Sequence, residues 1–140
     1  MLRTATLLLV EDNEGYAYLT ERVLRRVAPT LKIVTARSAE EALTLVATRR
    51  PDLILLDLLL PDMSGLDLLR ALRSEPVTTG VPVIVFSAYP DDANVRGAYS
   101  LLANAYLVKP EDVDELDATM RAFCEFWLQR ALLPSGPPTH

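Results

Sequence analysis

Residues 53–60 read Leu-Ile-Leu-Leu-Asp-Leu-Leu-Leu, a run of aliphatic side chains interrupted only by Asp57. A nearly continuous aliphatic run of this length predicts the central strand of a parallel sheet that helices cover on both faces. A carboxylate buried there without a partner costs several kcal/mol, so we expect Asp57 to meet a cation or to lie where the strand opens to water. Asp57 is therefore a candidate for chemistry. An aspartate that merely caps the following loop explains the same position about equally well.

Three further apolar runs end in polar residues suited to phosphate or metal chemistry. They are Glu11 and Asp12 after residues 7–10, Ser87 after residues 83–86, and Lys109 after residues 106–108. Each signal is weak alone, because paired acids commonly cap helices and one serine carries little information. However, the carboxyl ends of parallel strands gather at one edge of an open sheet, where doubly wound α/β folds bind ligands. We therefore expect these side chains and Asp57 to converge on one crevice.

The hydrophobic periodicity along the chain alternates between strand and helix five times. The expected strands cover residues 6–10, 31–36, 53–58, 82–86 and 105–109, and the expected helices about 14–27, 38–49, 64–73, 91–102 and 112–133. Within residues 14–27 the spacing predicts a buried stripe of Tyr18, Leu19, Val23, Leu24 and Val27. Gly97 should make the helix over 91–102 the least rigid of the five. We expect one domain over residues 1–133 and a disordered tail over 134–140, which is rich in proline.

Composition narrows the class of function. With 140 residues, half of them hydrophobic, the chain is long enough for a single core. The net charge of −5 and pI near 4.8 argue against nucleic acid as a direct partner. Cys124 is the only cysteine, no leader-like segment opens the chain, and no apolar stretch is long enough to span a membrane. These features predict a cytoplasmic protein.

Together these residues resemble the receiver domain of two-component response regulators over about residues 5–125. The resemblance rests on Glu11-Asp12, Asp57 with Pro61-Asp62-Met63-Ser64-Gly65 behind it, Ser87-Ala88, Tyr106 and Lys109-Pro110. It implies an α/β fold of the flavodoxin-like kind, a doubly wound, five-stranded parallel sheet in the order 2-1-3-4-5 with five helices. Ala103-Asn104 and the extended aromatic C-terminus are similar to those of small response regulators that partner bacterial phytochromes.

The resemblance also implies a mechanism. Asp57 takes a phosphoryl group from a phosphohistidine on a sensor histidine kinase, Lys109 pairs with Asp57 and then with the phosphoryl group, and Ser87 hydrogen-bonds a phosphoryl oxygen. Ser87 and Tyr106 then act as the switch, changing the face formed by residues 91–102, 105–109 and the last helix. The chain is by this interpretation a phosphoacceptor that catalyses its own phosphorylation, and not an enzyme. A bacteriophytochrome is one candidate kinase, and a histidine phosphotransfer protein one candidate recipient.

A divalent cation is part of the implied site. Mg²⁺ suits a site made only of oxygen ligands. The resemblance makes Asp12 and Asp57 direct ligands, Glu11 a ligand through water, and the backbone carbonyl of Leu59 the remaining protein ligand.

Three departures from the family pattern carry expectations of their own. Leu102 stands where most receivers have glycine, four residues before Tyr106, which predicts a different path into the strand over 105–109. Leu59 and Tyr89 occupy the positions two after Asp57 and two after Ser87, which tune loss of the phosphoryl group in the family. Because both are bulky and neither is acidic, we expect slow autodephosphorylation.

The C-terminal helix is expected to be longer than the sheet requires. Its predicted stripe comprises Leu116, Met120, Phe123, Trp127 and Ala131. A helix that runs to about Leu133 would reach about 30 Å, and it would leave Phe126, Leu128, Leu132 and Leu133 outside the stripe. We therefore predict a homodimer built on this helix and on residues 91–102 and 105–109. The alternative is that the helix end folds back over the sheet.

Two other functions stay open at this point. One is a receiver-like docking module that is never phosphorylated, although Asp12, Asp57 and Lys109 are all in place. The other is a phosphatase of the haloacid dehalogenase type, which also begins with a carboxylate after an apolar strand. That family needs a second aspartate two residues later, where this chain has Leu59.

Overall fold

A computed structural model describes residues 4–134. The alternation of strand and helix is as expected, with the elements β1 (Thr6–Val10), α1 (Glu14–Val27), β2 (Lys32–Ala36), α2 (Ala39–Thr48), β3 (Leu53–Leu56), α3 (Gly65–Ser74), β4 (Val83–Ser87), α4 (Asp92–Ser100), β5 (Ala105–Val108), α5 (Val113–Cys124) and a π-helical turn η1 (Glu125–Arg130). The predicted tail falls almost entirely outside the described residues. Within them, no helix is both long enough and apolar enough to cross a membrane.

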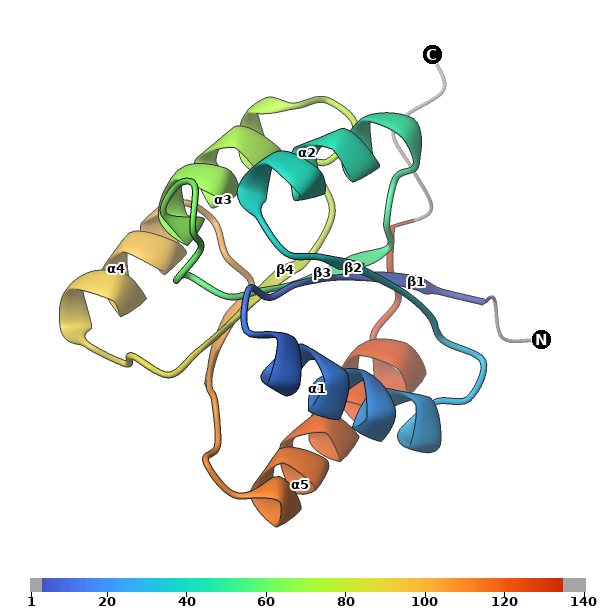
Figure 1. Ribbon diagram of the computed structural model, residues 1–140. Coiled ribbons are helices and arrows are strands. Elements are labelled where there is room, and N and C mark those ends of the chain that lie inside the picture. The colour runs from blue at the N-terminus through green and yellow to red at the C-terminus, as the bar shows by residue number, and fades with distance from the viewer. Residues whose placement is uncertain (1–3, 135–140) are drawn as a thin grey trace.

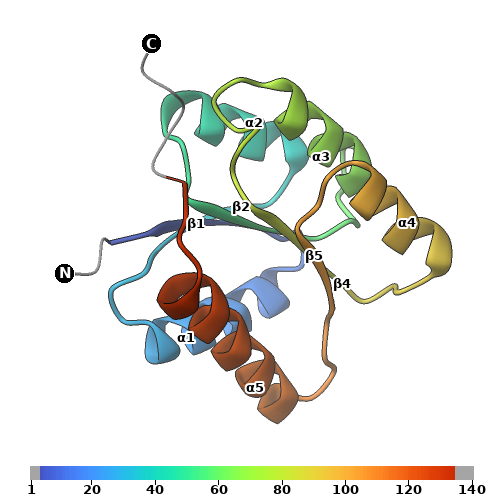
Figure 2. The ribbon, with the colours of Figure 1, turned by 180° about the vertical axis from the view of Figure 1, so that it is seen from behind.

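The five strands form one parallel sheet in the order β2-β1-β3-β4-β5, which confirms the predicted fold class. Helices α1 and α5 cover one face of the sheet, and α2, α3 and α4 lie on the other (Figures 1 and 2). β3 lies between β1 and β4, and all four of its residues are buried. The two-sided burial explains why the run over 53–56 contains only aliphatic residues.

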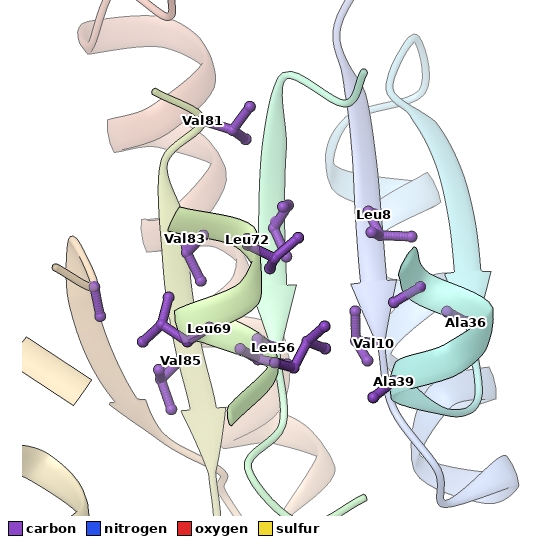
Figure 3. Close-up of a cluster of buried hydrophobic side chains, with 14 of the residues drawn as sticks. Leu8, Val10, Ala36, Ala39, Leu56, Leu69, Leu72, Val81, Val83 and Val85 are labelled. Atoms are coloured by element: carbon purple, nitrogen blue, oxygen red, sulfur yellow. The ribbon is translucent and has the colours of Figure 1, made fainter. Parts of the chain in front are cut away.

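Each face of the sheet has its own hydrophobic core, because side chains alternate between the two faces along every strand. Leu8, Val10, Leu56, Val83 and Val85 pack under α2 and α3 (Figure 3). The opposite core contains Leu7, Leu9, Leu53, Leu55 and Ile84, together with residues of α1 and α5. Neighbouring residues of β1, β3 and β4 therefore point into different cores, and a shift of the strand register by one residue would turn each side chain toward the opposite core.

Polar side chains cap the first turns of the helices. Ser38 accepts a hydrogen bond from the amide of Glu41 at 3.0 Å, and Ser64 accepts one from the amide of Asp67 at 3.1 Å. Asp91 and Asp112 cap α4 and α5 in the same way. These caps satisfy amides that have no partner within the first helical turn, so each helix begins where its polar side chain stands.

The prediction for the buried face of α1 was wrong in one residue. Tyr18 is 61% exposed, whereas Tyr16 is half-buried and packs against the core next to Leu19 and Val27. Residues two positions apart on a helix point about 200° apart, so one of these two tyrosines faces the sheet and the other faces solvent.

The C-terminal helix differs from its prediction in two ways. It changes to π-helical hydrogen bonding at Glu125 and ends at Arg130, before the predicted end at Leu133; the amide of Ala131 donates to the carbonyl of Phe126 at 2.7 Å. Leu128 and Leu133 pack against the core, so this end partly folds back. Phe126 remains exposed, as does Leu132. The helix end therefore folds back in part, while the homodimer stays a prediction.

The turn into β5 contradicts the expectation for Leu102. Leu102 has a φ of 67°, the left-handed conformation that glycine adopts most easily, so the chain follows the glycine path with a leucine. The turn closes with two hydrogen bonds, from the amide of Ala103 to the carbonyl of Ala98 at 2.9 Å and from the amide of Leu102 to the carbonyl of Tyr99 at 3.0 Å. This pattern is a Schellman motif, which ends α4 at the required place despite the strained residue.

Candidate functional site

The carboxyl ends of β1, β3, β4 and β5 lie side by side at one edge of the sheet. The main chain holds these ends together: the amide of Asp57 donates to the carbonyl of Val10 at 3.0 Å, and the amide of Lys109 donates to the carbonyl of Ser87 at 2.9 Å. β3 ends at Leu56, so Asp57 is the first residue beyond the strand, and not within it as the sequence predicted. Polar residues at the strand ends are thereby brought together from distant parts of the chain.

Lys109 is the centre of this cluster. Its ammonium lies 2.5 Å from Oε1 of Glu11 and 2.8 Å from Oδ2 of Asp57. The three side chains are 10%, 2% and 8% exposed, respectively, so the ion pairs are shielded from water. The expectation that Asp57 would meet a cation is confirmed. Two buried carboxylates compete for a single ammonium, which leaves the cluster with an excess of negative charge.

Burial raises the pKa of Glu11, because desolvation disfavours its charged form. The ammonium of Lys109 opposes this change through a hydrogen bond and charge attraction, while the charge of Asp57 adds to it. The amide of Asn13 also donates to Oε2 of Glu11 at 3.1 Å, which favours the carboxylate. The fold therefore buries Glu11 in a place where its charge depends on neighbouring cations.

The predicted metal ligands are only partly assembled. Asp12 lies in the loop after β1 with its side chain exposed, whereas Glu11 and Asp57 are joined by Lys109. Among residues 4–134 no group of three acidic, histidine or cysteine side chains is close enough together to hold an ion as it stands. The donor chemistry nevertheless fits a divalent cation, because carboxylate and carbonyl oxygens are the ligands that hard cations prefer.

The loop after β3 is fixed at three points around Asp57. The amide of Leu59 donates to Oδ1 of Asp57 at 3.2 Å, and the amide of Gly65 donates to the carbonyl of Leu58 at 2.8 Å. A Cβ atom on Gly65 would lie 2.4 Å from the Cα atom of Leu58, so only glycine fits. The third point is Asp62, whose carboxylate accepts from the amides of Ala39 and Glu40 at 3.0 and 2.8 Å. These two bonds at the start of α2 lower the pKa of Asp62.

Ser87 and Tyr106 lie on adjacent strands beside Asp57. Ser87 is fully buried, and its hydroxyl accepts from the amide of Tyr89 at 3.3 Å. The hydroxyl of Tyr106 donates to the carbonyl of Tyr89 at 2.6 Å, while its ring packs partly against the core under α3 and α4. Burial raises the pKa of Tyr106. Both candidate switch residues are thus connected to the same short loop after β4.

Leu59 and Tyr89 lie in the loops that follow Asp57 and Ser87. Their side chains are 61% and 56% exposed, in agreement with positions in the loops after β3 and β4. Neither side chain carries a carboxylate or an amide group.

The sequence analysis missed Tyr16 and the role of Asp62. Tyr16 reaches the site from α1: its hydroxyl donates to the carbonyl of Pro110 at 2.8 Å, and its ring lies under the ammonium of Lys109. Burial, followed by the charges of Glu11 and Asp57, raises its pKa to about 12. Hydrophobic spacing does not distinguish Tyr16 from an ordinary core aromatic. For Asp62 the signal was an acid inside a loop, but its partners lie on a helix distant in sequence.

Comparison with known proteins gives consistent matches. A family model described as the response regulator receiver domain matches residues 7–121. The probable methanogenesis regulatory protein FilR2 of Methanothrix harundinacea is 33% identical over 128 residues, which cover 87% of this chain and 83% of that protein. The response regulator Rcp1 of Synechocystis is 29% identical over 137 residues and 93% of each chain.

Two solved structures extend the similarity to three dimensions. The phosphorylated cyanobacterial phytochrome response regulator RcpA has a TM-score of 0.90 and 32% identity, covering 95% of this chain and all of that one. The Mn²⁺-bound form of Rcp1 has a TM-score of 0.83 and 27% identity, covering 94% of this chain and 99% of that one.

Proposed function

Since the chain belongs to the response regulator receiver domain family, we propose that Asp57 accepts a phosphoryl group from the phosphohistidine of a sensor histidine kinase. The observation that carries this proposal is the buried ion pair of Asp57 with Lys109, 2.8 Å apart at the carboxyl edge of the sheet. A carboxylate in that position stands at the end of a strand, and it has a cation beside it that can follow the phosphoryl group.

The chemistry requires mainly positioning and charge neutralisation. A carboxylate oxygen of Asp57 forms the new bond to phosphorus, and the phosphorus–nitrogen bond to the imidazole breaks. The electron pair of that bond remains on the imidazole nitrogen, which takes up a proton. The Lys109 ammonium, held until then by Oδ2 of Asp57, offsets the charge on the phosphoryl oxygens. The hydroxyl of Ser87, buried on the next strand, donates to one of them.

We propose that the site binds Mg²⁺. The carboxylates of Asp12 and Asp57 and the carbonyl of Leu59 would hold the ion, with Glu11 acting through water. When bound, the ion supplies positive charge that offsets the charge of the transferred group. Support comes from the oxygen-only donor set and from the related Rcp1 structure, whose bound metal is Mn²⁺. The exposed position of Asp12 leaves its carboxylate free to approach an ion.

Phosphorylation is proposed to act on the face of α4, β5 and α5 through Ser87 and Tyr106. The hydroxyls of Ser87 and Tyr106 both bond to main-chain atoms of Tyr89. A phosphoryl group that draws Ser87 toward Asp57 therefore loosens the same loop that holds Tyr106. The ring of Tyr106 then has room to turn further inward, and the surface beside it changes.

We further propose that the phosphorylated state is long-lived. The side chains of Leu59 and Tyr89 are bulky and exposed beside the site, and neither carries a carboxylate or amide that would orient an attacking water molecule. A phosphoryl half-life well beyond seconds, at neutral pH with Mg²⁺ present, is the expected result. Replacing Leu59 by asparagine should shorten it, and a half-life of seconds in the unchanged protein would refute the proposal.

Intact-mass spectrometry after incubation with acetyl phosphate and Mg²⁺ tests the central proposal. A single adduct of about 80 Da is expected on the wild type, and none on Asp57→Asn or without Mg²⁺. Lack of an adduct on wild-type protein shown to bind Mg²⁺ would instead favour a docking module without phosphorylation. Adduct formation that persists in Asp57→Asn would place the phosphoacceptor elsewhere.

The kinase is proposed to belong to a phytochrome-type light-sensing pathway, on the basis of similarity to RcpA and Rcp1.

The downstream interaction is proposed to be a homodimer through α4, β5 and α5. An apolar groove on this face is lined by residues such as Leu107, Ala118, Ala122 and Phe126. Phe126 is 55% exposed, which is unusual for so large an apolar side chain.

The dimer is best tested with a single substitution on the exposed rim. Phe126→Glu places a charge in the groove and leaves the half-buried Leu128 in place, so it should give a folded monomer in sedimentation analysis. Arg130→Glu, a neighbouring charge change on the exposed end of η1, serves as the control. If Phe126→Glu sediments as the wild type does, the interface is elsewhere or the protein is a monomer.

A further inference from the structure

Tyr16 connects α1 to Lys109 and to the residue after it, through its ring and its hydroxyl. The ammonium of Lys109 lies 4.7 Å from the centre of the Tyr16 ring, within the range of a cation–π contact. The hydroxyl of Tyr16 donates to the carbonyl of Pro110 at 2.8 Å. The ring itself is held by Phe86 of β4, with ring centres 6.0 Å apart and planes tilted by 59°.

We propose that Tyr16 is a positioning residue that holds the Lys109 ammonium in the crevice while its charged partners change. This inference rests on the phosphoacceptor function proposed above. A lysine side chain has four rotatable bonds, so its ammonium needs contacts on several sides to stay in one place. Glu11 and Asp57 supply two of them as charged partners. The face of the Tyr16 ring supplies a third, which is not a carboxylate.

The chemical difference between these contacts is the reason for the proposal. When a phosphoryl group is attached to Asp57, the carboxylate loses its charge and the ammonium must turn toward the phosphoryl oxygens. The bond to Asp57 is then given up, but the attraction to the ring face is not directional in the same way and persists as the ammonium rotates. Tyr16 thus keeps the cation close to the reacting atoms in both states.

The hydroxyl adds a constraint on the backbone. The amide of Lys109 is already fixed to the carbonyl of Ser87 at 2.9 Å. The bond from Tyr16 fixes the next residue, Pro110, and therefore the start of the segment that leads to α5. The main chain on both sides of the Lys109 side chain is thereby attached to neighbouring elements, which limits where the ammonium can reach.

Two substitutions separate the ring from the hydroxyl. Tyr16→Phe keeps the aromatic face and removes the tether to Pro110. Tyr16→Met keeps similar apolar volume against Phe86 and removes the aromatic face. Tyr18→Met is the matched control, because Tyr18 is two residues away on the same helix and points into solvent. Amide NMR spectra of all three variants verify that each one is folded.

The first readout is independent of phosphorylation. Protons of the Lys109 side chain next to the ammonium lie over the ring, so in metal-free protein their NMR signals should be shifted upfield. The shift should persist in Tyr16→Phe and Tyr18→Met and disappear in Tyr16→Met. If Tyr16→Met leaves these signals unchanged, the ring does not hold the ammonium and the inference is wrong.

The second readout is the rate of phosphorylation by acetyl phosphate at saturating Mg²⁺. We expect Tyr16→Met to be slower by about tenfold, the size of effect that losing a partly buried cation–π contact produces. Tyr16→Phe should recover most of the wild-type rate, and Tyr18→Met all of it. If Tyr16→Phe is as slow as Tyr16→Met, or both match the wild type, the inference fails. A wild-type protein that takes up no phosphoryl group refutes the proposed function instead, and the NMR shifts still decide the role of Tyr16.

Discussion

Each of the two edges of the sheet has a long cationic side chain with several partners, and the partners of these two cations differ in kind. At the carboxyl edge, Lys109 contacts the carboxylates of Glu11 and Asp57. At the amino edge, Arg73 at the end of α3 donates to the carbonyls of Val81 and Leu102 at 2.6 and 2.8 Å. Its guanidinium also donates to the side-chain carbonyl of Asn104 at 3.0 Å, and burial lowers its pKa.

This difference distinguishes the carboxyl edge, where we propose the chemistry takes place, from the amino edge, which supports the fold. The partners of Arg73 are neutral dipoles of the main chain and one amide, so no ligand or modification alters what it binds. On the function proposed above, the partners of Lys109 are acids: a bound metal ion would offset their charge, and a phosphoryl group would remove the charge of Asp57. The carboxyl edge is therefore responsive to its surroundings, whereas the amino edge keeps the loops before β4 and β5 in place.

Lys109→Met should give the largest effect on stability. The substitution leaves Glu11 and Asp57 buried together without a cation, and loss of one partner of a buried ion pair costs about 3 kcal/mol. We expect the free energy of unfolding of metal-free protein at pH 7 to fall by about that amount in urea titrations. Mg²⁺ should restore part of the loss, because it offsets the same two charges.

Lys32→Met is the matched control for this prediction. Lys32 is the only other lysine, and it lies exposed at the start of β2. Its removal should change the free energy of unfolding by less than about 0.5 kcal/mol, with or without Mg²⁺. A Lys109→Met protein as stable as the control in the absence of metal would show that the acids do not depend on the ammonium.

Arg73→Met should be less destabilising and insensitive to metal. The substitution removes hydrogen bonds to carbonyls on two loops, but water can reach part of this site and replace some of them, so we expect a loss of about 2 kcal/mol. The same urea titrations should give this loss equally with and without Mg²⁺. Arg73→Lys should recover little of it, because an ammonium lacks the planar fork that reaches several carbonyls. A clear response to Mg²⁺ would contradict the separation of the two edges.

The residues of the carboxyl edge could be predicted from the sequence because each one is marked by its immediate neighbours in the chain. An aliphatic run that ends in a polar residue identifies both the strand and the residue at its end, and the parallel order then brings Glu11, Asp57, Ser87 and Lys109 together. Asp12 is next to Glu11 in the sequence, but its side chain is exposed and is not part of the cluster around Lys109. The pairing of Lys109 with Asp57 was implied by the resemblance to receiver domains, and the structure confirms it.

The sequence was not sufficient where a contact depends on side-chain direction or on strain. On α1 the helical spacing itself places Tyr16 on the buried face and Tyr18 opposite it, so the prediction of Tyr18 misread the pattern. What the spacing does not show is that the Tyr16 side chain reaches Lys109. The π-helical turn from Glu125 to Arg130 has no periodic signal, because it changes the period itself. Arg73 was predicted only as the end of a helix, since all its partners but Asn104 are main-chain atoms, which no residue type identifies.

Leu102 is the residue where sequence and backbone conflict, and Leu102→Gly is the smallest of the three expected effects. The left-handed conformation costs a residue with a Cβ atom about 1–2 kcal/mol, which glycine avoids. Glycine loses more entropy on folding, so a net gain of about 1 kcal/mol in the free energy of unfolding is expected. The side chain is 68% exposed, so its removal sacrifices little burial.

The same position tests whether the amino edge is held by conformation or by contacts. Leu102→Ala keeps the Cβ atom and therefore the strain, so it should give no gain, whereas Leu102→Gly should raise the melting temperature by about 3 °C. The carbonyl of Leu102 accepts from Arg73 whichever residue is present. In an Arg73→Met background the gain from glycine should shrink, because the turn is then free to relieve its strain by moving. An undiminished gain in that background would show that the Schellman turn alone fixes Leu102, with no help from Arg73.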